Sequence, residues 1–146
     1  RHIDQVTVNE YQAGVGLAPH IDTHSAFEGA IHSLSLAGHT VMEFRRGDDH
    51  RGLLLPPRSL LVMSGDSRLA WLHYIPHRKY DRLPGDEQPI ARPPLRLSIT
   101  LRTVKYTPCT CEFPPDCDSR QPEMLDTLNR KREIENALKA SDHAAP

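Results

Sequence analysis

The chain has 146 residues, 38% of them hydrophobic and 25% charged, which predicts one domain with a hydrophobic core. Its formal net charge is -1 at pH 7, so it lacks the strongly basic balance of a protein that binds nucleic acid over its whole surface. No apolar run approaches the length of a membrane-spanning helix and no signal-peptide pattern is present, so we expect no membrane partner.

Short strands separated by glycine and proline turns are predicted over most of the chain. The first strand alternates Val6 and Val8 with polar neighbours, which is typical of a half-buried strand, and Gly47 begins the turn of a hairpin. Residues 80–94 contain four prolines and are predicted as a loop. The predicted strands are residues 5–11, 31–36, 40–44, 53–55, 59–63, 69–75 and 95–104, and the strand at 59–63 is predicted to be buried.

The predicted strand at residues 95–104 shows the strictest alternation of apolar and polar side chains. It places Leu95, Leu97, Ile99 and Leu101 on one side and Arg96, Ser98, Thr100 and Arg102 on the other. Roughly seven or eight strands without helical periodicity before residue 120 predict an all-β sandwich or jelly roll. Only residues 122–139 predict a helix. We therefore expect a β-rich core over residues 1–118, including the cysteine-rich segment, and a helical extension over residues 119–146.

A histidine and an aspartate stand two residues apart at His20 and Asp22. Residues i and i+2 of an extended chain face the same side, so an imidazole nitrogen and a carboxylate oxygen can meet one metal ion there. Two histidines and one carboxylate on one face are the ligands of a non-haem Fe(II) oxygenase. The pair therefore supplies two of the three ligands of such a site.

The third ligand would come from a distant strand. His73 is the best candidate because it stands in an apolar strand, where a buried imidazole needs a partner. The alternative is a core histidine bonded to a backbone carbonyl. The full set of candidates is His32, His39, His50, His73 and His77.

Two arginines, Arg96 and Arg102, stand on the polar side of the last strand. An arginine that points into a jelly roll requires an anion, which a dicarboxylate ligand supplies through a bidentate pair. The two residues are separated by roughly 20 Å on an ideal strand, so only one of them is expected to bind a given carboxylate. The alternative is an exposed polar face with two solvated arginines.

The three cysteines, Cys109, Cys111 and Cys117, lie in one short segment. Their odd, clustered number argues against a secreted disulfide framework, so we expect a cytoplasmic location, with the nucleus as an alternative. Three thiolates and a histidine fit a tetrahedral zinc ion. His24 is our choice for the fourth ligand, because it stands roughly 14 Å from His20 along an extended chain and cannot share the iron. The alternative is three reduced cysteines on a loop.

The order of these motifs resembles the AlkB family of Fe(II)/2-oxoglutarate dioxygenases, over about residues 4–118. The family motifs are Asn-x-Tyr, His-x-Asp, a distal His and Arg-x-Asn-x-Thr-x-Arg. Ser98 departs from them, because many family members have Asn at this position. Within the family, the runs 20–28, 33–36, 58–63 and 107–111 most resemble the branch that hydroxylates the wobble uridine of tRNA.

The resemblance implies a double-stranded β-helix that uses Fe(II), 2-oxoglutarate and O2 to hydroxylate a substrate carbon. It also agrees with zinc bound by His24 and the three cysteines. The implied iron ligands are His20, Asp22 and His73, and the implied contacts of 2-oxoglutarate are Asn9, Tyr11, Arg96 and Arg102, the last also near Asp22.

The substrate implied by the resemblance is 5-methoxycarbonylmethyluridine in the tRNA anticodon loop. Two rivals remain open: an oxidative demethylase of N-methylated nucleobases in RNA or DNA, and an inactive zinc-containing module that binds RNA or a protein. Because the chain begins at Arg1 without Met, we expect it to be a piece of a longer protein. The resemblance suggests RNA-binding or methyltransferase domains as further parts of that protein. Candidates for phosphate contacts are Arg45, Arg46, Arg51, Arg78, Lys79 and Arg82.

Overall fold

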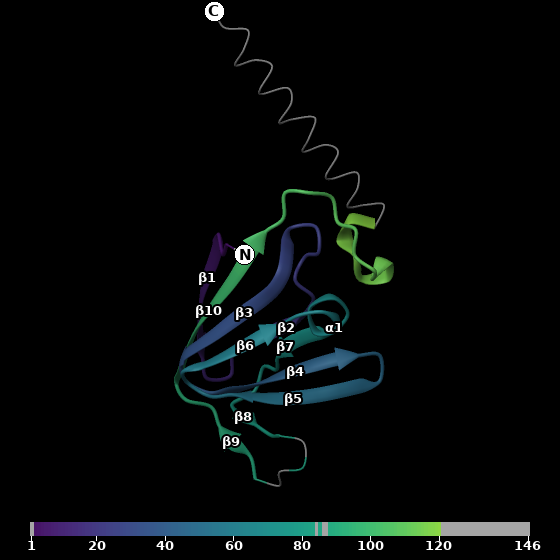
Figure 1. Ribbon diagram of the computed structural model, residues 1–146. Helices are drawn as coiled ribbons and strands as arrows, with labels where there is room; N and C mark the ends of the chain where they lie inside the picture. Colours follow the sequence, from purple (N-terminus) through teal and green to yellow (C-terminus); the bar gives the residue numbers. More distant parts are fainter. Residues whose placement is uncertain (1, 84, 86–87, 121–146) are drawn as a thin grey trace, which may run out of the picture.

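A computed structural model describes residues 2–83, 85 and 88–120. Its strands form two antiparallel four-stranded sheets and one two-stranded hairpin (Figure 1). This confirms the predicted all-β jelly-roll fold. Within these ranges, no helix has the length and apolar character needed to cross a membrane. The helix predicted at residues 122–139 lies outside the described residues.

The two sheets lie face to face and diverge toward the side where residues 105–120 are found (Figure 1). The first sheet has the order β1 (Gln5–Gln12), β10 (Leu95–Val104), β3 (Phe27–Ala37) and β6 (Ser59–Met63). The second has the order β2 (Leu17–His20), β7 (Leu72–Ile75), β4 (Thr40–Arg46) and β5 (Asp49–Leu55). The hairpin pairs β8 (Tyr80–Asp81) with β9 (Ile90–Ala91), and the helical turns are α1 (Asp66–Leu69), η1 (Pro114–Asp116) and η2 (Asp118–Arg120).

The hydrophobic core fills the space between the sheets. Its buried members come from both layers, and Trp71 and Tyr11 pack against it from the rim. Burial of these apolar side chains is the main force that holds the two sheets together. The buried members are Ile31, Met42, Phe44, Leu55, Met63 and Ile75.

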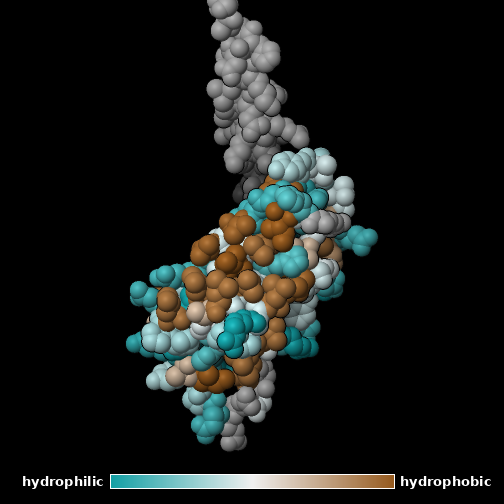
Figure 2. Space-filling model, turned by 60° about the vertical axis from the view of Figure 1, so that its left-hand side comes forward, coloured by the Kyte–Doolittle hydropathy of each residue, from teal (hydrophilic) through white to brown (hydrophobic). Residues whose placement is uncertain are grey.

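The first sheet turns an apolar face outward, which sequence alternation did not predict. Val6 and Val8 on β1 are 58% and 65% exposed, and Leu60 on the edge strand β6 is 55% exposed. The register joins Val8, Ile99, Leu34 and Leu60 in one row across the four strands. Figure 2 shows the resulting apolar surface. Residues 59–63 were therefore wrongly predicted as a buried strand, because only alternate side chains face the core.

Two other predicted segments differ in detail. The strand predicted at 69–75 is shorter, because α1 ends at Leu69 and β7 begins at Leu72. The loop predicted at 80–94 contains the short strands β8 and β9. Arg92, which follows β9, donates hydrogen bonds to both carboxylate oxygens of Asp81 in β8.

Gly16 is required where β2 begins. A Cβ atom at this position would overlap the carbonyl oxygen of Ile75. Only glycine permits this close approach of two backbones. The close approach pairs β2 with β7, and this pairing positions the first predicted metal ligand.

Candidate functional site

A cavity of about 110 Å³ lies between the two sheets. It brings together all seven residues that the sequence predicted for iron and 2-oxoglutarate. Its lining is Asn9, Tyr11, Leu17, His20, Asp22, Ser33, Met42, Met63, His73, Ile75, Arg96, Ser98, Thr100 and Arg102.

Strand pairing places the two histidines. His20 ends β2 and is the register partner of His73 on β7, with ring centroids 4.3 Å apart. Asp22 follows two residues after the end of β2, so its side chain returns to the face that His20 occupies. Ligand atoms of the three residues lie within 4.8 Å of one another. Among the described residues, none of the other four candidate histidines joins them.

The free atoms of this triad fit a metal ion. The His20 Nδ1 contacts the Ala18 carbonyl at 2.8 Å, which leaves Nε2 available. The Asp22 Oδ1 accepts hydrogen bonds from Arg102, whereas Oδ2 is buried without a hydrogen-bond partner among the described residues, 3.8 Å from the His73 Nε2. A buried oxygen of this kind is rare unless it has a ligand. Two imidazoles and one carboxylate are the donor set of a non-haem Fe(II) oxygenase.

The electrostatics of His73 favour metal binding. Burial, and then the neighbouring His20, lower its pKa to about 4. The imidazole is therefore neutral at pH 7, which is the form that offers a lone pair to a metal. Contacts to the other atoms of such ligands orient them, as the Ala18 carbonyl does for His20 and Arg102 does for Asp22.

Arg96 lies at the other end of the cavity, buried and without a carboxylate partner among the described residues. Its guanidinium donates to the Ser98 hydroxyl at 2.8 Å and to the Ser35 hydroxyl at 3.2 Å, and its Nε has no partner. It also lies over the ring of Tyr11, 5.5 Å from the centroid. A buried arginine held only by neutral groups is ready to pair with an anionic ligand. Ser98, which replaces the Asn of many family members, thus supports this guanidinium.

The two remaining predicted 2-oxoglutarate contacts come from β1. Asn9 donates from Nδ2 to the Thr100 hydroxyl at 3.2 Å. Burial raises the pKa of Tyr11, although the charge of Arg96 opposes this change. Tyr11 therefore remains a neutral phenol that can donate a hydrogen bond into the cavity.

A second cluster of possible metal ligands lies where residues 109–120 contact the segment that follows β2. Ligand atoms of His24, Cys111 and Cys117 lie within 4.8 Å of one another, and the Cys111 Sγ is 3.4 Å from the His24 Nδ1. Cys109 is outside this group but adjoins it: burial alone would raise its pKa, yet hydrogen bonds from Cys111 and Cys117 lower it. A lowered pKa favours the thiolate, the form that binds a metal.

The segment 109–120 is attached to the rest of the chain through Asp118. Its carboxylate accepts hydrogen bonds from the Ser25 amide, at 3.1 Å, and from the Ser25 hydroxyl. Because Ser25 follows His24, this contact keeps the cysteines beside the histidine. The structure therefore brings together the four residues predicted to bind zinc, three of them within direct reach of one ion.

Two buried residues that support the site were not predicted from the sequence. Ser35 supports Arg96, and Arg68 donates hydrogen bonds to the main chain beside Asp22. Arg68 precedes the strand of His73 by a few residues, and nothing in its local pattern distinguishes it from a surface arginine. Of the basic residues predicted to contact phosphates, Arg46, Arg51 and Arg78 form ion pairs with Asp66, Asp49 and Glu43.

Comparison with known proteins agrees with this geometry. Residues 1–102 match the family model of the 2OG-Fe(II) oxygenase superfamily. The chain belongs to this superfamily. The oxygenase is 50% identical to the Alkylated DNA repair protein ALKBH8 homolog of Arabidopsis thaliana, with 82% of this chain and 40% of that protein covered. The predicted AlkB resemblance is thereby confirmed.

Other relatives of the oxygenase are much longer than this chain. It is 42% identical to the tRNA (carboxymethyluridine(34)-5-O)-methyltransferase alkbh8 of Xenopus tropicalis, with 81% of this chain but only 21% of that protein covered. The solved structure of OsALKBH1 has the same fold, with a TM-score of 0.53, 22% identity and coverage of 70% of this chain and 49% of that one. As a member of the superfamily the chain is a dioxygenase that uses Fe(II), 2-oxoglutarate and O2.

Proposed function

We propose that this oxygenase hydroxylates the C5 side chain of 5-methoxycarbonylmethyluridine at the wobble position of tRNA. The observation that carries the oxygenase part is the convergence of His20, Asp22 and His73 on one side of the cavity and Arg96 on the other. The substrate part is supported by relatives whose names specify carboxymethyluridine at position 34 of tRNA. O-methylation of that carboxylate gives the methyl ester that we propose as substrate.

The methyl transfer itself is not assigned to this chain. This chain matches only about a fifth of the length of the methyltransferases. Their transferase activity and their RNA partners therefore belong to proteins that contain further regions. We propose that comparable RNA-binding or methyltransferase regions accompany this oxygenase, in the cytoplasm or the nucleus. The chain described here would supply the oxidation.

The residues of the cavity would act by positioning. His20, Asp22 and His73 would hold Fe(II), which with bound 2-oxoglutarate and O2 supplies an oxidant that hydroxylates a carbon while 2-oxoglutarate becomes succinate and CO2. Arg96 would pair with the distal carboxylate of 2-oxoglutarate through its guanidinium.

Other side chains would support these ligands. Asn9 and Tyr11 would hydrogen-bond the cosubstrate, and Arg102 would orient the Asp22 carboxylate through its hydrogen bonds to Oδ1. None of these side chains needs to transfer a proton, because orientation of the reactants is the main contribution that such a site makes.

A second candidate is an oxidative demethylase of N-methylated nucleobases, and the DNA-repair name of the Arabidopsis relative favours it. Both activities require the same iron and cosubstrate residues, so they differ only in the carbon that is hydroxylated. An inactive RNA- or protein-binding module is the third candidate. The convergence of three iron ligands and an unpaired arginine argues against it, because a binding module does not need them.

The deciding experiment is mass spectrometry of nucleosides from tRNA incubated with the protein, Fe(II) and 2-oxoglutarate. We expect a gain of one oxygen atom on 5-methoxycarbonylmethyluridine with matching release of succinate, and neither in His20→Ala. Loss of methyl groups from N-methylated bases would instead establish the demethylase. Absence of succinate release with every RNA tested would favour the binding module.

We also propose that His24, Cys109, Cys111 and Cys117 bind a structural zinc ion. The support is the cluster of a buried histidine and thiols, with the His24 Nδ1 3.4 Å from the Cys111 Sγ. Metal analysis should find one equivalent of zinc in the wild type and none in Cys111→Ser, together with a lower Tm. Equal zinc content in the two proteins would contradict the site.

A further inference from the structure

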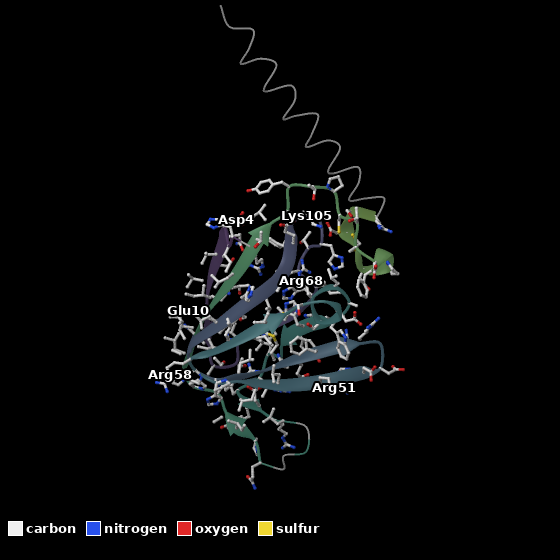
Figure 3. All side chains as sticks on the ribbon, in the orientation of Figure 1. Asp4, Glu10, Arg51, Arg58, Arg68 and Lys105 are labelled. Atoms are coloured by element: carbon white, nitrogen blue, oxygen red, sulfur yellow. The ribbon has the colours of Figure 1, made fainter. Side chains whose placement is uncertain are left out.

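A buried arginine outside the predicted site lies between the two ligand clusters. Arg68 is in α1, the helical turn between β6 and β7, and is only 2% exposed. Figure 3 shows it within the molecule, whereas the labelled Arg51 and Arg58 lie at its periphery. Burying a guanidinium is unfavourable unless its donors find partners. The partners of Arg68 therefore indicate why it is buried.

Those partners are two successive carbonyl groups. The Arg68 Nη1 donates to the Asp22 carbonyl at 2.6 Å, and Nη2 donates to the Thr23 carbonyl at 3.1 Å. Residues 21–24 belong to no strand, so no sheet ladder fixes these carbonyls, although the Thr23 carbonyl also accepts a hydrogen bond from the Phe27 amide at 3.3 Å. The planar guanidinium can hold both at once because its donors form a rigid fork.

The clamped segment carries one ligand of each cluster. Asp22 belongs to the iron triad and His24 to the cysteine cluster. The two carbonyls that Arg68 binds are those of Asp22 itself and of Thr23, the residue between the two ligands. Arg102 binds the carboxylate of Asp22 at 2.8 Å, so two arginines hold this residue, one by its side chain and one by its main chain.

We propose that Arg68 is a positioning residue that directs Asp22 toward the iron and His24 toward the cysteines through a single main-chain clamp. Metal binding at each cluster then depends on the same side chain. The inference rests on the iron and zinc sites proposed above. Lysine cannot replace Arg68, because one ammonium group does not reproduce the paired donors.

The test compares Arg68→Lys with the wild type and with Arg46→Lys as a matched control. Arg46 pairs with Asp66 of the same helical turn at 2.9 Å, but its side chain is 47% exposed and contacts neither cluster. Mn(II), a redox-silent substitute for Fe(II), is titrated in the presence of 2-oxoglutarate and followed by electron paramagnetic resonance. We expect Arg68→Lys to weaken Mn(II) binding by about tenfold to a hundredfold, and Arg46→Lys to leave it unchanged.

A second readout separates positioning from simple destabilisation. The rise in Tm that Mn(II) with 2-oxoglutarate produces should be smaller in Arg68→Lys than in the wild type, and its zinc should be lost to a chelator sooner. A merely structural residue would lower the Tm of the metal-free protein and leave the Mn(II)-induced rise unchanged. Arg68→Gln, which removes the buried charge, is measured instead if the lysine variant shows no cooperative transition.

The outcomes distinguish this inference from the function on which it rests. A folded Arg68 variant with wild-type Mn(II) affinity, Tm rise and zinc retention would overturn the clamp. Failure of the wild type itself to bind Mn(II) would contradict the iron site. Weakened Mn(II) binding with unchanged zinc retention would overturn the coupling of the two clusters.

Discussion

Two buried aspartates in this oxygenase have opposite surroundings. Asp81 is completely buried, and both of its carboxylate oxygens are bound: Arg92 reaches Oδ1 at 2.7 Å and Oδ2 at 2.8 Å, and the Val41 amide donates to Oδ2 at 2.9 Å. Asp22 is 7% exposed and uses only Oδ1, which accepts from Arg102, while Oδ2 faces His73 without a hydrogen bond.

Two buried arginines differ in the same way. Arg92 binds Asp81 and the Pro76 carbonyl, whereas Arg96 is held by serine hydroxyls and its Nε has no partner. Buried polar atoms are nearly always hydrogen-bonded, so an unpaired one requires an explanation. Asp81 and Arg92 therefore satisfy each other within the fold, whereas Asp22 and Arg96 each keep an atom without a hydrogen-bond partner among the described residues, as expected of residues that await a ligand.

The largest effect is expected from Asp22→Asn, which keeps the shape of the side chain but removes its charge. Turnover should be lost, and Mn(II) affinity should fall by more than about a hundredfold, beyond the range typical of residues that only support ligands. Mn(II) titration with 2-oxoglutarate measures this. Wild-type affinity in the variant would remove Asp22 from the triad.

Asp81→Asn should act on stability instead. Because it leaves Arg92 buried beside a neutral group, the free energy of unfolding should fall by about 3–5 kcal/mol, while folded protein keeps its Mn(II) affinity. Urea unfolding measures the first quantity. Asp49→Asn is the matched control: Asp49 is 67% exposed and 4.0 Å from Arg51, so its effect should stay within about 0.5 kcal/mol.

Acidification should lower the free energy of unfolding of the metal-free protein through the titration of His73. Its pKa is about 4 in the folded state, below the ordinary value of about 6.5, so the unfolded chain takes up the proton first as the pH falls. This contribution to stability is complete above about pH 6.5 and is lost toward pH 4, by up to about 3 kcal/mol. Urea unfolding at several pH values should show the loss, and His73→Asn should reduce it.

The smallest effect is expected from Arg96→Lys, which retains the charge but not the paired donors. The 2-oxoglutarate concentration needed for half-maximal succinate release should rise by about tenfold, because the ammonium group makes fewer hydrogen bonds to a carboxylate. Arg92→Lys is the comparison, since it should lower the Tm more than it changes the 2-oxoglutarate requirement. An unchanged requirement in Arg96→Lys would contradict its role as anchor.

Most strands could be predicted because alternation is local, as in β10. Alternation alone does not decide which side faces inward, and for Arg96 and Arg102 the sequence left a solvated face as the alternative to a ligand cavity. On β10 the polar side faces the cavity, with Arg96 5% and Ser98 2% exposed, whereas Leu95 is 45% exposed. Usual alternation places apolar residues inward, and a ligand cavity between the sheets reverses it here. Val6 and Val8 on β1 follow the same reversal.

The kinds of candidate ligand and their order can be read along the chain: His20 with Asp22, a distant histidine, an arginine strand and three clustered cysteines. Folding makes His20 and His73 strand partners, leaves the Asp22 Oδ2 without a hydrogen-bond partner among the described residues, and places Arg68 against the segment between the two clusters. These contacts could not be predicted because the residues that make them are far apart in the sequence. Arg68 and Asp22 are 46 positions apart and Arg102 and Asp22 are 80 apart, so only the pairing and packing of the sheets bring them into contact.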